Sequence, residues 1–124
     1  MTKRIHIVED DEDIRYIVCY ILVEMGYEVT LADCVADFRK QQKEDFRPDL
    51  MLLDVMLPDG NGLRLCHELK NDPATQHIPI IIMSAHATED QVIKQSCADD
   101  FISKPFNLDD LTDLIQKYLS LQIS

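Results

Sequence analysis

The stretch from residue 51 to residue 60 reads MLLDVMLPDG, and it decides the fold. Together with Leu50 it forms an apolar run that ends in a single carboxylate, Asp54, shortly before a Leu-Pro-Asp-Gly turn. A short apolar run bounded by turn residues is typical of a strand buried on both faces of a parallel sheet. We therefore expect a strand over residues 50–53 with Asp54 at its carboxyl end.

Outward from this strand, segments with the pattern of a strand alternate with segments of helical period. Apolar residues recur every three or four positions from Ile14 to Met25, and Gly26 after them is a typical C-cap. Thr88 begins a capping box, and Asn107 is a typical N-cap. The predicted strands are 4–8, 27–31, 50–53, 79–83 and 100–103, and the predicted helices are 14–25, 34–46, 63–70, 88–97 and 107–119.

Five strands that alternate with five helices predict an α/β fold of the flavodoxin-like kind, a doubly wound five-stranded parallel sheet. We expect the strand order 2-1-3-4-5, because it places strands 1, 3 and 4 side by side. This order opens a crevice at the carboxyl ends of these strands, where such folds bind ligands. The chain of 124 residues has the usual size of one domain, so we expect a single domain over residues 1–124.

The chain is strongly acidic, with 23 Asp and Glu against 12 Lys and Arg and a formal net charge of -11. Nucleic acids and anionic membranes are bound by clustered Lys and Arg, so we expect no direct contact with either. The apolar stretches are far shorter than the roughly 20 residues that span a bilayer, which predicts a cytoplasmic protein. The scattered cysteines show no C-x-x-C spacing, and we assign them neither a metal nor a disulfide.

Polar side chains follow four of the five predicted strands: Glu9 and Asp10, Asp54, Ser84, and Lys104. Taken singly, each is more simply explained as a helix cap, a turn residue or a solvated lysine. Because the carboxyl ends of parallel strands share one edge of a sheet, together they predict a single site. Crowded carboxylates need a proton or a cation, and oxygen ligands of this kind suit Mg²⁺.

A carboxylate such as that of Asp54 can act as a nucleophile toward phosphorus and form an aspartyl phosphate. The metal ion and the ammonium group of Lys104 would neutralise the charge of the transferring phosphoryl group, and the hydroxyl of Ser84 would donate to one of its oxygens. The chain has no Gly-x-x-x-x-Gly-Lys-Ser/Thr loop, which excludes a P-loop nucleotide site.

Four motifs in this order resemble the receiver domain of two-component response regulators. They are IVEDDEDIR (7–15), LLDVMLPDGNGL (52–63), MSA (83–85) and ADDFISKPF (98–106), and the resemblance covers essentially the whole chain. It implies a phosphorelay protein in which Asp54 accepts a phosphoryl group from the phosphohistidine of a sensor histidine kinase or a phosphotransfer protein.

The resemblance also implies a role for each matching position. Mg²⁺ would be bound by Asp54, directly by Asp10, through water by Glu9, and by the backbone carbonyl of Met56. Ser84 and Lys104 would contact the phosphoryl group, with a cis peptide before Pro105 aiming the lysine. Phe101 stands at the switch-aromatic position, and its burial would remodel the face of helix 4, strand 5 and helix 5 for a downstream effector.

Alternative readings remain open beside this one. A Mg²⁺-dependent phosphohydrolase also uses a strand-end aspartate, but it needs a second acid where Met56 stands. A receiver fold without phosphorylation would not need crowded acids that destabilise it. The chain is either a stand-alone receiver or one cut from a longer protein, and we expect no enzyme activity beyond loss of its own phosphoryl group. His86 and the side chain of Met56, at the rim of the pocket, either modulate how fast water reaches the aspartyl phosphate or are exposed loop side chains without a role.

Overall fold

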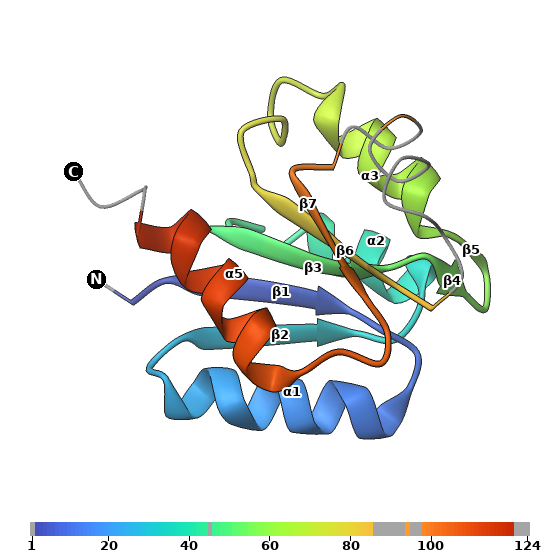
Figure 1. Cartoon of the computed structure of the whole chain (residues 1–124). Helices are drawn as coiled ribbons and strands as arrows, with labels where there is room; N and C mark the ends of the chain where they lie inside the picture. The colour runs from blue at the N-terminus through green and yellow to red at the C-terminus, as the bar shows by residue number, and fades with distance from the viewer. Residues whose placement is uncertain (1, 45, 86–93, 95–97, 121–124) are drawn as a thin grey trace.

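The computed structural model describes residues 2–44, 46–85, 94 and 98–120, and its centre is a five-stranded parallel sheet (Figure 1). The strand order is β2-β1-β3-β6-β7, which is the predicted order 2-1-3-4-5 once the strands of the sheet are counted along the chain. Every neighbouring pair is parallel. The strands are β1 (Arg4–Val8), β2 (Glu28–Ala32), β3 (Leu50–Asp54), β6 (Ile80–Ser84) and β7 (Asp100–Ser103).

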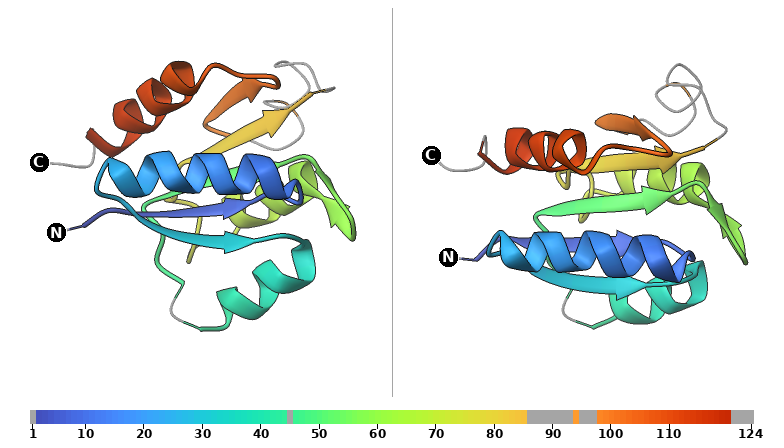
Figure 2. Two further views of the ribbon diagram at one scale, coloured as in Figure 1. Left: turned by 90° about the horizontal axis from the view of Figure 1, so that it is seen from below. Right: turned by 60° about the horizontal axis from the view of Figure 1, so that its bottom comes forward.

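Helices cover both faces of the sheet (Figure 2). α1 (Glu12–Glu24) and α5 (Leu108–Ser120) pack on one face, and α2 (Val35–Gln42) and α3 (Gly62–Lys70) pack on the other. The predicted helix over 88–97 lies outside the described residues, except for Lys94, which is helical. The remaining four helices and the parallel sheet confirm the doubly wound α/β fold.

The core consists of two apolar layers because the side chains of each strand alternate between the faces of the sheet. Ile5 and Ile7 of β1 point toward the α1 and α5 side, whereas Val8 points toward the α2 and α3 side. β3 and β6 are buried along their whole length, as expected for central strands of a sheet covered on both faces. Asp54 and Met83 are paired in register, so the ends of these two strands lie side by side.

Several element boundaries differ from those expected from sequence. α1 begins at Glu12 because the side chain of Asp11 accepts hydrogen bonds from the first backbone amides of the helix. α2 ends at Gln42 rather than at residue 46, because Phe46 leaves the helix and packs edge-on against Phe38, with 5.3 Å between ring centroids. Gly26 has the positive φ of 94° expected for the residue that ends α1.

The segment after β3 contains a small hairpin where we expected only a loop. β4 (Met56–Leu57) pairs antiparallel with β5 (Gly60–Asn61), and the side chain of Asn61 then caps α3 by accepting from the amide of Leu63 at 2.7 Å. The hairpin leads the chain directly from Asp54 to α3. Within the described part of the chain, none of the helices has the length and apolar character needed to cross a membrane.

Candidate functional site

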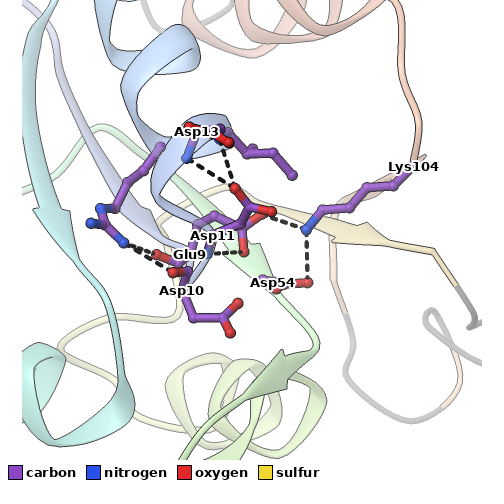
Figure 3. A network of polar contacts seen from close by, with 8 residues as sticks. Glu9, Asp10, Asp11, Asp13, Asp54 and Lys104 are labelled. Carbon is purple, nitrogen blue, oxygen red and sulfur yellow. Dashed lines mark hydrogen bonds and ion pairs between the residues drawn. The ribbon is translucent and has the colours of Figure 1, made fainter.

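A cleft of about 350 Å³ opens at the carboxyl edge of the sheet, where β1, β3, β6 and β7 end. It brings together side chains that lie as many as 95 positions apart in the sequence, as Figure 3 shows for the acidic residues and the lysine. The described residues that line it are Glu9, Asp10, Asp11, Ile14, Asp54, Met56, Ser84, Ala85 and Lys104.

Three carboxylates dominate the electrostatics of this cleft. One oxygen each of Glu9, Asp10 and Asp54 lies within 4.8 Å of the others, and Glu9 and Asp54 are buried while Asp10 is exposed. Burial is the main reason that the pKa of Glu9 is raised to about 8, and the neighbouring Asp54 adds to this effect. Among the described residues of the cleft, the acidic side chains therefore outnumber the positive charge that faces them.

Lys104 supplies that positive charge from the residue after β7. Its Nζ is paired with Oε1 of Glu9 and lies 3.3 Å from Oδ1 of Asp54. Burial works against the charge on the ammonium group, but the hydrogen bond to Glu9 and its attraction outweigh burial, so the pKa of Lys104 is raised. One ammonium group thus faces three carboxylates, and this donor set of carboxylate oxygens fits a hard divalent cation such as Mg²⁺.

Two residues that sequence reasoning did not assign to the site hold its first acidic segment in place. Asp11 caps α1 by accepting from the amides of Asp13 at 2.9 Å and Ile14 at 3.1 Å. Arg15 donates from Nη1 to the backbone carbonyl of Glu9 at 3.0 Å. An aspartate shortly before an apolar helical run is an N-cap signal, but Asp10, Asp11 and Asp13 all precede Ile14, so the signal does not single out Asp11. The contact of Arg15 has no such local signal.

Gly62 is a third residue missed by sequence reasoning. A Cβ atom at this position would lie 1.9 Å from the backbone oxygen of Asp54, and the amide of Gly62 donates to the carbonyl of Val55 at 2.7 Å. A side chain cannot be accommodated here without moving the backbone that carries Asp54. The absence of a Cβ therefore lets the first turn of α3 lie directly against the end of β3.

The other residues expected at the site differ in where they lie relative to the cleft. Ser84 is buried at the end of β6 and lines the cleft, and its carbonyl accepts from the amide of Lys104 at 2.8 Å. The Lys104–Pro105 peptide is cis, as the resemblance implied. Met56 lines the cleft and is 66% exposed. Phe101 is half-buried against the α2 and α3 side of the core and is not among the described residues of the cleft. His86 lies outside the described residues.

This fold, with an acidic cleft and a lysine at the carboxyl edge, defines a class of signalling protein. Residues 5–116 match the family described as the response regulator receiver domain. The chain belongs to this family, which confirms the resemblance found in its motifs. It is a receiver domain of the two-component type.

Particular relatives sharpen this assignment. The chain is 36% identical over 118 residues to the phosphate regulon transcriptional regulatory protein PhoB of Escherichia coli, an alignment that covers 94% of this chain and 51% of PhoB. The chain thus spans about half the length of this relative.

Two solved structures show the same fold. The phosphorylated cyanobacterial phytochrome response regulator RcpA has a TM-score of 0.81 and 26% identity, covering 98% of this chain and 96% of its own. The receiver domain of a sensor histidine kinase from Pseudomonas aeruginosa, with a magnesium ion coordinated in its active site cleft, has a TM-score of 0.82 and 25% identity, covering 97% of this chain and 99% of its own.

Proposed function

We propose that Asp54 is the phosphoacceptor of this receiver domain. A carboxylate oxygen of Asp54 attacks the phosphorus of a phosphohistidine, an O–P bond forms, and the P–N bond breaks as the imidazole leaves with the bonding electrons. The observation that carries this proposal is the position of Asp54, at the end of a fully buried strand, in an open cleft, and 3.3 Å from the ammonium of Lys104. RcpA, a relative of similar fold, is described as phosphorylated.

We further propose a Mg²⁺ site in the same cleft. Asp10, Asp54 and the backbone carbonyl of Met56 would hold the ion directly, and Glu9 through water. When bound, Mg²⁺ would neutralise charge on the transferring phosphoryl group. The proximity of the three carboxylates and the magnesium ion described in the P. aeruginosa relative support this site.

Lys104 and Ser84 would contact the phosphoryl group once Asp54 is phosphorylated. Lys104 now pairs with Glu9, and it would transfer this pairing to the phosphoryl oxygens, with Ser84 donating to another oxygen. The half-buried ring of Phe101 would then bury further. The face that the resemblance assigns to helix 4, strand 5 and helix 5 would change shape and bind a downstream effector. Of this face, the structure describes β7 and α5, while the predicted helix 88–97 lies outside the described residues except for Lys94.

The exposed side of α1 supports docking of a protein that carries the phosphohistidine. Tyr16 is 72% exposed, and Ile17, Tyr20 and Val23 are exposed on the same helix, which begins at the cleft. Such a row of apolar side chains at helical spacing fits an apolar helical surface of a sensor kinase or phosphotransfer protein.

PhoB is named a transcriptional regulator, so the expectation that this chain makes no direct contact with nucleic acid stays a prediction.

Intact mass measurement after incubation with acetyl phosphate and Mg²⁺ tests the phosphoacceptor directly. We expect one added phosphoryl group on the wild-type chain and on Asp110→Asn, a control at an exposed aspartate of α5, and none on Asp54→Asn. Modification of Asp54→Asn to the wild-type extent would contradict the assignment. Sustained hydrolysis of acid-stable phosphomonoesters would instead favour the phosphohydrolase alternative.

A further inference from the structure

The side chain of Arg15 reaches back from α1 to the segment that carries the first two acids of the cleft. Its Nη1 donates to the carbonyl oxygens of Glu9, at 3.0 Å, and Asp10, at 3.2 Å. Arg15 itself is half-buried in the early turns of a helix whose start is fixed by the Asp11 cap. One side chain therefore ties α1 to both peptide groups that follow the end of β1.

These two peptide groups determine the direction of the Asp10 side chain. The carbonyl of Glu9 belongs to the peptide plane before the Asp10 Cα, and the carbonyl of Asp10 belongs to the plane after it. Because peptide groups are planar, holding both planes restrains the φ and ψ of Asp10 and hence its Cβ direction. Glu9 has the additional support of the sheet, since its amide donates to the carbonyl of Ala32 at 3.0 Å. Asp10 lies one residue beyond that support.

We propose that Arg15 is a positioning residue for the Mg²⁺ site: its guanidinium holds the Glu9 and Asp10 peptide groups so that the exposed carboxylate of Asp10 stands ready for the ion. This inference rests on the proposed function, because it concerns the same Mg²⁺ site. A guanidinium suits the role since it keeps its proton under all relevant conditions and donates to two carbonyls at once.

Two opposing effects decide whether removal of Arg15 strengthens or weakens Mg²⁺ binding. The positive charge of Arg15 repels a cation, but it is partly exposed to solvent and is therefore screened. Loss of a group that orients a metal ligand typically weakens metal affinity by about 10-fold to 100-fold. The orienting effect outweighs screened repulsion, so removal of Arg15 weakens Mg²⁺ binding.

Calorimetric titration of the full chain with Mg²⁺ tests the proposal. We expect Arg15→Met and Arg15→Gln to bind Mg²⁺ about 10-fold more weakly than wild type. Arg64→Met changes the net charge equally at an exposed position of α3 and is expected to bind like wild type. The Arg15 variants should need about 10-fold more Mg²⁺ than wild type to reach half of their maximal rate of phosphorylation by acetyl phosphate, whereas Arg64→Met should follow the wild-type curve.

The outcomes separate this inference from the proposed function. Thermal unfolding without Mg²⁺ identifies which Arg15 variants are folded, and a folded variant that binds Mg²⁺ within twofold of wild type overturns the role of Arg15 alone. If wild type shows no saturable binding that depends on Asp10, the Mg²⁺ site and the role of Arg15 fail together. A folded Arg15 variant that reaches half of its maximal phosphorylation rate at the same Mg²⁺ concentration as wild type also overturns this role.

Discussion

His6 and Glu9 lie three positions apart at the first strand, and both are buried, but the protein uses them differently. His6 stands in the middle of β1, and its ring packs against the rings of Phe38 and Phe46, with centroids at 5.5 Å and 5.6 Å. Its Nδ1 is hydrogen-bonded to the hydroxyl of Thr30. Burial lowers the pKa of His6 to about 4, whereas burial and Asp54 raise that of Glu9 to about 8. In each case burial favours the uncharged form.

The difference between the two regions lies in what surrounds the buried group. Around His6 the neighbours are two aromatic rings and a hydroxyl. Glu9 follows the last residue of β1, where the sheet ends and a cleft opens, and its neighbours are two carboxylates and an ammonium group. The middle of the strand thus holds a buried histidine among aromatic rings, and the edge brings acids and a lysine together in a cleft that a cation or a phosphoryl group can reach.

The largest expected effect concerns the packing that carries the edge. Gly62→Ala places a Cβ 1.9 Å from the backbone oxygen of Asp54, so the end of β3 or the start of α3 must move. We expect urea unfolding to show a loss of about 3 kcal/mol. In Gly60→Ala the new Cβ meets only a side-chain methyl of Val35, at 2.8 Å, and the loss should be clearly smaller. Equal losses of stability in the two variants would show that the close approach of Gly62 to the Asp54 carbonyl causes no strain of its own.

The buried His6 in the middle of β1 should make the stability of the protein depend on pH. His6 has a folded-state pKa of about 4, below the 6.5 of an unfolded histidine, so the unfolded chain binds the proton first. The contribution of His6 to the free energy of unfolding is therefore full above pH 6.5 and falls by about 3 kcal/mol as the pH drops to 4. Glu9 acts in the opposite sense, because its raised pKa makes the folded chain hold a proton that the unfolded chain has lost.

The contribution of His6 is therefore best measured in a chain that lacks the carboxylate of Glu9. Urea unfolding of Glu9→Gln between pH 4 and 6.5 should show stability that rises with pH. The double variant Glu9→Gln/His6→Leu should lose most of this slope, whereas Glu9→Gln/His67→Leu, altered at an exposed histidine of α3, should keep it. A slope that persists without His6 would contradict the assignment.

The fold and the main site residues could be predicted because their signals are local. Apolar runs such as 50–53 and 79–83 indicate central strands, and the residue that follows each run must lie at the shared carboxyl edge of a parallel sheet. Asp54 and Lys104 were found in this way. This reasoning needs the strand ends, which short sequence patterns indicate, and the strand order, which we inferred from the doubly wound fold class.

The features that could not be predicted depend on distances between elements. The approach of Gly62 to the Asp54 carbonyl and the contacts of Arg15 with two carbonyls follow from how α3 and α1 sit on the sheet. Nothing in the run Gly-Asn-Gly distinguishes a helix start in close contact with a strand from an ordinary loop. The burial of His6 likewise depends on Phe46, which the sequence pattern placed inside a helix.

The smallest expected effect comes from removing one negative charge, that of Asp54, from the carboxyl edge of the sheet. Asp54→Asn removes the charge of Asp54 beside Glu9 while Lys104 keeps its partner Glu9, so relief of repulsion should exceed the lost attraction at 3.3 Å. In buffer without Mg²⁺ we expect the free energy of unfolding to rise by about 1 kcal/mol. Mg²⁺ should stabilise wild type more than the variant, because a neutral amide at this position is a weaker ligand than a carboxylate. A lower melting temperature of the variant without Mg²⁺ would mean that the edge carboxylates are not in electrostatic conflict, and the contrast with His6 would then be one of packing alone.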